Sequence, residues 1–62
     1  MNNTNTMSNT YNISDNHTMV IQQIDKIEGK VILNGIMLCW IEWSKADEFA
    51  DAIKETLLKY RI

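Results

Sequence analysis

The chain has 62 residues and a net charge of −2; 45% of its residues are hydrophobic and 23% are charged. This composition is that of one small globular domain, and the acidic balance argues against nucleic-acid binding, which needs clustered lysine and arginine. One cysteine and one histidine exclude an intrachain disulfide and a zinc site built from four such ligands. We therefore expect no cofactor and no bound metal.

Residues 1–18 differ from the rest of the chain, because asparagine, threonine and serine dominate them. Such a segment has too few apolar side chains to offset the entropy lost on ordering. We expect a flexible tail over 1–18 and a folded domain over 19–62. The polar start does not resemble a secretory signal, and no run reaches the roughly 18 apolar residues of a membrane span. We expect a cytoplasmic protein that makes no membrane contact.

The first predicted strand covers residues 19–27, which are rich in isoleucine and contain neither Gly nor Pro. Its apolar residues alternate imperfectly, so a bulge is expected there, and a helix is the competing interpretation. Glu28-Gly29 is predicted to form the turn that follows, because Gly accepts a positive φ.

The most apolar stretch, residues 31–43, contains Asn34-Gly35 near its middle. Asn-Gly between two apolar runs is the strongest short-range hairpin signal, because both residues accept the positive φ of a type I′ turn. We therefore expect strands over 30–33 and 36–43, paired through this turn. The later strand is apolar on both faces except at Glu42, so it needs a cover on each side.

A C-terminal helix is predicted over residues 45–61, which contain neither Gly nor Pro. Ser44 is expected to cap its first turn, and Asp47 and Glu48 place negative charge at the positive end of the helix dipole. One apolar stripe recurs at helical period: Ala46, Phe49, Ala50, Ile53, Leu57 and Tyr60. The predicted fold class is α+β: a small three-stranded antiparallel meander followed by one amphipathic helix, or βββα.

One helix covers one face of a sheet, so the sequence predicts a second apolar face without a cover. Regular pairing through both turns, with Val31 opposite Leu38, places six residues on one face: Ile24, Val31, Leu33, Ile36, Leu38 and Trp40. The other face then carries Ile21, Ile27, Ile32, Met37, Cys39, Ile41 and Trp43. We expect the second set beneath the helix, since a small thiol suits an interior. A bulge would exchange the two faces.

The first set is therefore the predicted interface with a partner, because monomers rarely expose so large an apolar patch. Hiding a few hundred Å² per subunit at about 25 cal/mol per Å² would supply roughly ten kcal/mol before association costs. We expect a homodimer with two-fold symmetry, formed either by stacked faces or by paired edge strands.

Residues with chemical potential show no catalytic arrangement. Cys39 lies mid-strand without a nearby base, and His17 lies in the predicted tail, so neither indicates a nucleophile. Asp47, Asp51 and Glu55 form an acidic helix face, which is expected to be solvated or to contact a basic partner. We expect no enzyme activity.

The functional hypothesis is a small interaction protein, a homodimer that binds another protein and inhibits or adapts it. Its small size and its Asn-, Ile- and Lys-rich composition suggest a phage-encoded inhibitor of a host enzyme or defence system. The alternative is a protein that binds or sequesters a small, nucleotide-like ligand where two subunits meet, with Trp40 or Tyr60 stacking on it. A DNA-binding β-ribbon ranks last, because the strands offer only Lys26 and Lys30.

Overall fold

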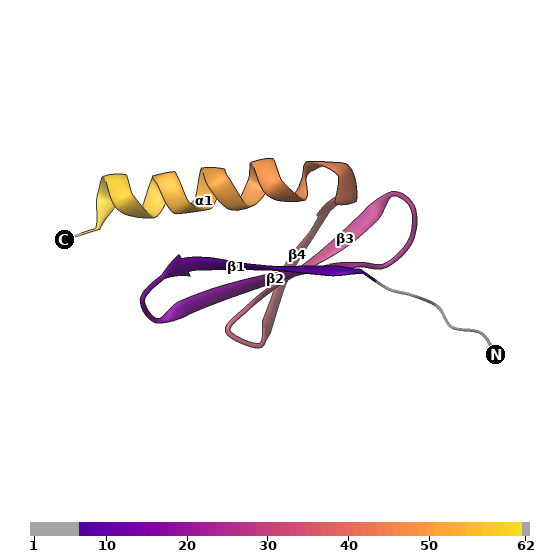
Figure 1. Cartoon of the computed structure of the whole chain (residues 1–62), viewed down its shortest axis with the longest axis horizontal. Helices are drawn as coiled ribbons and strands as arrows, with labels where there is room; N and C mark the ends of the chain where they lie inside the picture. The colour runs from indigo at the N-terminus through magenta and orange to yellow at the C-terminus, as the bar shows by residue number, and fades with distance from the viewer. Residues whose placement is uncertain (1–6, 62) are drawn as a thin grey trace.

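The computed structural model describes residues 7–61, which form four antiparallel strands and one C-terminal helix (Figure 1). The strands pair in chain order, and the α+β class and the meander are confirmed. The number of strands is four, so the prediction of three is wrong by one. The elements are β1 (Ser8–Ser14), β2 (His17–Gln23), β3 (Glu28–Leu33), β4 (Ile36–Glu42), the 3-10 turn η1 (Trp43–Lys45) and α1 (Ala46–Tyr60).

The additional strand, β1, lies within the Asn/Thr-rich segment for which a tail was predicted. It pairs with β2 from Ser8 to Ser14, with a register shift near its end. Two of its side chains, Tyr11 and Ile13, lie two positions apart and share one face, and Ile13 is only 7% exposed. Backbone pairing with β2 and the packing of these two side chains beneath α1 order a strand that is otherwise polar. Residues 1–6 of the predicted tail lie outside the described residues.

The connection between β2 and β3 also differs from the prediction. β2 ends at Gln23, and the turn occupies residues 24–27 rather than Glu28-Gly29. Asp25 organises this turn, because its Oδ1 accepts hydrogen bonds from the backbone N–H groups of Ile27 at 2.8 Å and Glu28 at 2.7 Å. These bonds stabilise the carboxylate, so the pKa of Asp25 lies below its ordinary value of 3.8. A short polar side chain that bonds the backbone ahead of it replaces glycine as the turn former.

Gly29 has a packing role instead of a turn role. It lies in β3, paired with Gln23 on one side and Ile41 on the other. A Cβ atom at this position would lie 3.2 Å from Cγ2 of Ile21 and 3.3 Å from Cε3 of Trp43. The missing side chain therefore lets the Trp43 ring approach the sheet closely.

The Asn34-Gly35 turn is confirmed, with positive φ angles of 48° and 84°. Leu33 pairs with Ile36 as predicted, but Val31 pairs with Cys39, so the ladder passes over Leu38. Leu38 is the extra residue of a β-bulge. Side chains alternate between the two faces of a strand. The extra residue therefore moves the residues of β4 before Leu38 to the face opposite the one predicted from their spacing to Cys39.

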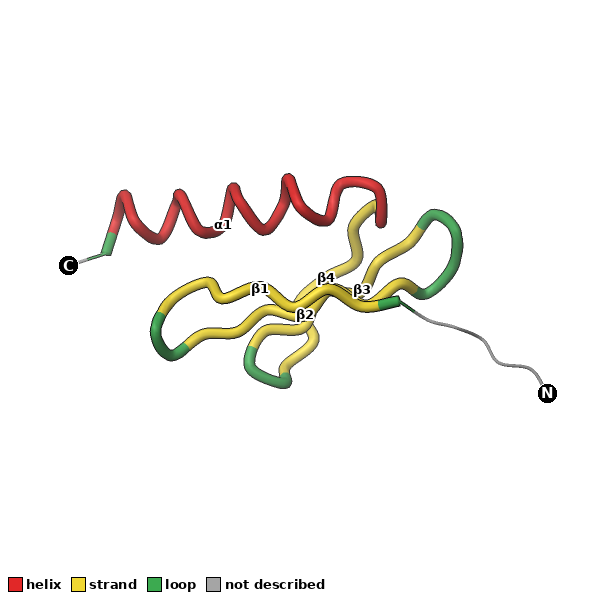
Figure 2. The backbone as a smooth tube through the Cα atoms, in the orientation of Figure 1, coloured by secondary structure: helices red, strands yellow, loops and turns green. Residues whose placement is uncertain are grey.

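The core lies between α1 and the centre of the sheet. Figures 1 and 2 show the helix leaving the end of β4 and running back above β1 and β2, and it packs against β1. Ala46 and Ala50 are small, which allows this close approach. The buried residues come from four elements: Ile13, Met19, Ile21, Val31, Ala46 and Ala50. Seven partly buried residues pack around them: Tyr11, Leu33, Cys39, Ile41, Trp43, Phe49 and Ile53.

The start of α1 corrects one predicted detail. Ser44 lies inside η1, the N-cap position is Lys45, and no side chain caps the helix. The 3-10 turn supplies the approach to the helix, so the predicted Ser44 cap is wrong. Asp47 and Glu48 lie in the first turn, as predicted from the helix dipole, and Lys59 lies in the last turn, where a positive charge is also favourable.

Candidate interaction surface

The face of the sheet opposite α1 carries an apolar row that crosses three strands. Val20 pairs with Ile32, and Ile32 pairs with Met37, so these side chains lie side by side. Trp40 extends the row along β4 and is 52% exposed, while Met37 is 49% exposed. Nζ of Lys30 lies 6.0 Å from the centre of the Trp40 ring, at the edge of cation–π range.

The six residues of the predicted interface do not form one face. Val31 is fully buried in the core, and Leu33 packs against that core. Ile24 lies in the β2–β3 turn and is partly exposed. The remaining three, Ile36, Leu38 and Trp40, are exposed along β4. The bulge at Leu38 explains the division, because the prediction assumed an unbroken register.

The set predicted to lie beneath the helix divides at the same place. Ile21 is fully buried there, and Cys39, Ile41 and Trp43 pack against the core. Ile32 and Met37 instead lie on the opposite face, because the register shift falls between them and Cys39. Ile27 lies in the β2–β3 turn and is 67% exposed, so it takes no part in the core.

We define the β4 surface as Ile36, Met37, Leu38 and Trp40, the exposed apolar residues along this strand. Met37 and Trp40 lie on the face opposite α1, whereas Ile36 pairs with Leu33 and lies on the helix side. The exposed fractions of the four residues, in chain order, are 66%, 49%, 52% and 52%. β4 is an edge strand, because it pairs only with β3 within the sheet. Its sequence contains neither lysine nor proline, the residues that commonly protect an edge from pairing. Its protective features are the bulge at Leu38 and the charge of Glu42 at its end.

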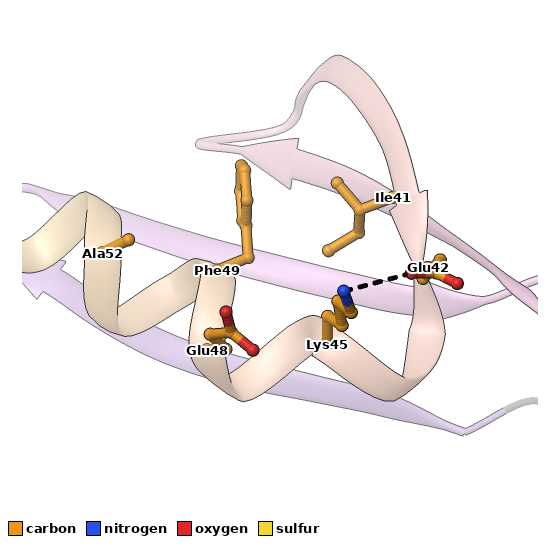
Figure 3. Close-up of a pocket in the computed structure, with 6 residues that line it drawn as sticks. All are labelled: Ile41, Glu42, Lys45, Glu48, Phe49 and Ala52. Carbon is orange, nitrogen blue, oxygen red and sulfur yellow. Dashed lines mark ion pairs between the residues drawn. The ribbon is translucent and has the colours of Figure 1, made fainter.

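Two shallow hollows of about 280 and 270 Å³ adjoin the C-terminal half of β4. Figure 3 shows the first, where Phe49 of α1 and Ile41 of β4 point into the space between their elements. It is lined by Ile41, Glu42, Lys45, Glu48, Phe49 and Ala52. The second lies beside Trp40 and is lined by Ile27, Glu28, Trp40, Ile41 and Glu42. Ile41 and Glu42 line both, so the two hollows flank the same part of the edge.

The charges around these hollows are mainly negative. Glu28 and Glu42 are direct cross-strand partners, a like-charge pair that costs stability. Nζ of Lys45 lies 3.6 Å from Oε1 of Glu42 and offsets part of this repulsion. The pair is exposed, so its net contribution is small. Glu48 adds a further carboxylate to the first hollow. Both hollows therefore disfavour an anionic ligand.

The predicted acidic helix face is divided by a contact with β1. The phenol Oη of Tyr11 donates a hydrogen bond to Oδ1 of Asp47 at 2.6 Å and accepts one from the side-chain amide of Asn9 at 3.1 Å. Asp47 is therefore part of the junction between α1 and β1, whereas Asp51 and Glu55 are exposed. Partial burial and the bond to Asp47 raise the pKa of Tyr11 above its ordinary value of 10.0.

The remaining candidates for chemistry stay separate. The ring nitrogen Nδ1 of His17 lies 2.7 Å from Oγ of Ser14 at the β1–β2 turn, and Cys39 lies under the helix. Across residues 7–61, no three histidine, cysteine or acidic side chains are grouped as metal ligands would be. Within the same residues, no helix has the length and apolarity needed to cross a membrane.

The sequence interpretation missed two residues that organise this structure, Tyr11 and Asp25. The two-residue spacing of Tyr11 and Ile13 was a strand signal, obscured by the polar residues around it. Asp25 also indicates a turn, but the turn was predicted four residues later, at Gly29, because glycine is the stronger turn former.

Comparisons with protein-family models, with curated proteins and with solved structures gave no match, so no family is assigned.

Proposed function

We propose that this protein is a small non-enzymatic interaction protein that associates through the β4 surface. It forms a homodimer and binds another protein, which it inhibits or adapts. The observation that carries this proposal is the exposure of about half of each large apolar side chain on the β4 surface. An edge strand of this kind is a ready template for pairing.

The energy available to such an association is substantial. Fully burying one exposed side chain of this size contributes about 1.5–3 kcal/mol. Hiding the exposed half of each of the four therefore supplies roughly 3–6 kcal/mol per subunit before association costs. Summed over two subunits, this is comparable with the whole stability of a small domain.

A small, nucleotide-like ligand is the less favoured alternative. Small-molecule sites usually enclose roughly 300–1,000 Å³, and each hollow beside β4 falls just below this range. The carboxylates of Glu28, Glu42 and Glu48 would also repel a phosphate group. An apolar strand from a protein is compatible with both properties.

The more specific form of the proposal is a phage-encoded inhibitor of a host enzyme or defence system. Support for it comes from the Asn-, Ile- and Lys-rich composition. In this form, the dimer would present its remaining exposed groups, including Asp51 and Glu55, to the target.

The test compares two lysine substitutions by sedimentation equilibrium of the full chain. Trp40→Lys places a charge on the β4 surface and is expected to raise the dimer dissociation constant at least tenfold, since tryptophan often dominates interfaces. Leu58→Lys is the matched control, because Leu58 is 60% exposed but lies on α1. It should associate like the wild type. Circular dichroism checks that both variants fold. Equal association of all three proteins would overturn the proposed surface.

A further inference from the structure

We infer that the edge of β4 pairs antiparallel with the β4 edge of a second copy, centred on Ile41. This inference rests on the proposed function and adds the geometry of the contact. Two four-stranded sheets then join into one continuous sheet of eight strands. Both helices lie on the same side of it, because a two-fold axis perpendicular to a sheet preserves its faces.

The backbone of β4 indicates which peptide groups face the free edge. The N–H of Trp43 donates to the carbonyl oxygen of Ile27 at 2.7 Å, so residues 27 and 43 form a hydrogen-bonded pair. Such pairs alternate with non-bonded pairs along an antiparallel ladder. Ile41 therefore bonds towards β3, whereas Trp40 and Glu42 direct their N–H and C=O groups away from it.

These two residues determine the register of the second copy. Only positions that both face outward can exchange hydrogen bonds across the new seam. Pairing Trp40 with Glu42 of the second copy, and Glu42 with Trp40 of the second copy, makes two bonds from the Glu42 N–H groups to the Trp40 carbonyl oxygens and places Ile41 opposite its own equivalent. Each Glu42 carbonyl oxygen already accepts the first bond of η1. The bulge at Leu38 ends the regular segment, so a register centred nearer the turn would meet irregular backbone.

The hollows beside β4 are consistent with this arrangement. In strand addition, main-chain bonds hold the incoming strand while its alternating side chains occupy pockets on the two faces. Ile41 of the second copy lies on the helix side, at the hollow bounded by Ile41 and Phe49. Trp40 of the second copy lies on the other side, beside Glu42 and the second hollow. The two Glu42 side chains are separated by this register and do not face each other.

A second copy is favoured over an unrelated strand by the character of the edge. Trp40 is the member of the β4 surface that lies within this register. The strand backbone of residues 40–42 and the walls of the two hollows supply the rest of the buried area. The opposite edge, β1, is polar and lies under α1, so β4 is the edge that remains open for self-pairing.

Replacement of Glu42 separates edge pairing from other contacts. Its φ of −71° matches that of proline, and its N–H faces away from β3, so Glu42→Pro should preserve the monomer while removing two bonds of the seam, one from each subunit. Glu42→Gln is the matched control, because it removes the charge but retains the N–H. We expect Glu42→Pro to raise the dimer dissociation constant at least tenfold and Glu42→Gln to change it less than threefold.

A disulfide test examines the register. Opposed residues of a non-bonded pair have Cα atoms about 4.5 Å apart, within the roughly 4.4–6.8 Å range of disulfides. In a Cys39→Ser background, Ile41→Cys should therefore give an oxidised dimer on a non-reducing gel, whereas Leu58→Cys should not. A seam centred elsewhere would leave both variants monomeric on the gel, which would overturn the register.

The outcomes distinguish this inference from the proposed function. If Trp40→Lys weakens association but Glu42→Pro does not, the β4 surface associates by stacking and the edge seam is overturned. If the wild type binds an edge strand of another protein but never forms a dimer, the inference that a second copy occupies the β4 edge is overturned. If Trp40→Lys has no effect on association, the proposed surface itself fails.

Discussion

The two hairpins of the sheet have opposite characters. The β1–β2 hairpin begins with a polar strand, Ser8–Ser14, and it lies beneath the helix (Figure 1). The β3–β4 hairpin ends with the most apolar strand, Ile36–Glu42, and its last strand is a bare edge. The polar strand is covered and the apolar strand is exposed, which reverses the arrangement expected of an isolated globular domain.

The reason for this difference is the path of the chain. α1 follows β4 directly and turns back across the sheet, so it covers the strands beyond its own starting edge. A helix that packs against β1 does not also cover that edge. The apolar residues on β4 therefore lie outside the core, and we interpret them as a surface kept for association. The following predictions test this division, from the largest expected effect to the smallest.

Truncation of the core should cost much more stability than truncation of the β4 surface. Ile21 is fully buried beneath the helix, so Ile21→Ala should lower the free energy of unfolding by about 2–5 kcal/mol through a cavity. Met37 is about half exposed, and Met37→Ala should lower the free energy of unfolding of the monomer by less than about 1 kcal/mol. Urea unfolding at a concentration where the protein is monomeric measures both. Equal losses would mean that β4 belongs to the core.

Filling the space at Gly29 should disturb the contact between β3 and Trp43. The Cβ of Gly29→Ala meets a core side chain on one side and an indole ring on the other. Overpacking of this kind costs about 1–3 kcal/mol. Thermal unfolding followed by near-ultraviolet circular dichroism reports both the loss and the changed Trp43 environment. A variant as stable as the wild type would show that Trp43 is not held against the sheet.

Removal of the Tyr11 hydroxyl should weaken the attachment of α1 to β1. Tyr11→Phe loses the hydrogen bond to Asp47 and should cost about 1 kcal/mol, which is below the range of about 1.5–3 kcal/mol for bonds to charged groups because the contact is partly exposed. Tyr60→Phe is the control, since Tyr60 is 72% exposed. Chemical denaturation at neutral pH compares them.

The same bond has a defined pH dependence. The folded-state pKa of Tyr11 is raised, so its contribution to stability is fully present below pH 10.0 and is lost as the pH rises through the folded-state value. The difference between wild type and Tyr11→Phe should shrink in that alkaline range. A constant difference would indicate that the hydroxyl is not bonded in the folded state.

The turn at Asp25 should show the smallest effect, with the opposite pH dependence. The folded-state pKa of Asp25 is lowered, so its contribution is present above pH 3.8 and is lost as the pH falls through the folded-state value. Asp25→Asn should lower the melting temperature slightly at pH 7 and leave it unchanged at strongly acidic pH. Asp15→Asn, in the β1–β2 turn, is the control. A melting-temperature difference that is independent of pH would contradict the assigned carboxylate bonds.

Much of the fold followed from local patterns in the sequence. Asn34-Gly35 identified the hairpin, and the stripe containing Ala46 and Ala50 identified the helix and the face that it buries. These signals are local, because a turn or a helix face depends on residues that are close in the chain. β1 was missed because its order depends on tertiary contacts of Tyr11 and Ile13 that no local pattern contains.

The candidate surface could be predicted only in part. The sequence correctly indicated that apolar residues of the strand 36–43 exceed what one helix can cover, and Ile36, Leu38 and Trp40 are exposed. It failed for Val31 and Leu33, because the bulge at Leu38 has no marker such as a glycine. A one-residue insertion then reversed the assignment of faces.

The central claim is that the β4 surface is an association surface, and the most direct test is the molar mass of the full chain by light scattering across a dilution series. The account predicts twice the 7.2 kDa chain mass at high concentration, falling towards 7.2 kDa on dilution. A mass of 7.2 kDa at every concentration, with the chain folded, would contradict self-association through the β4 surface.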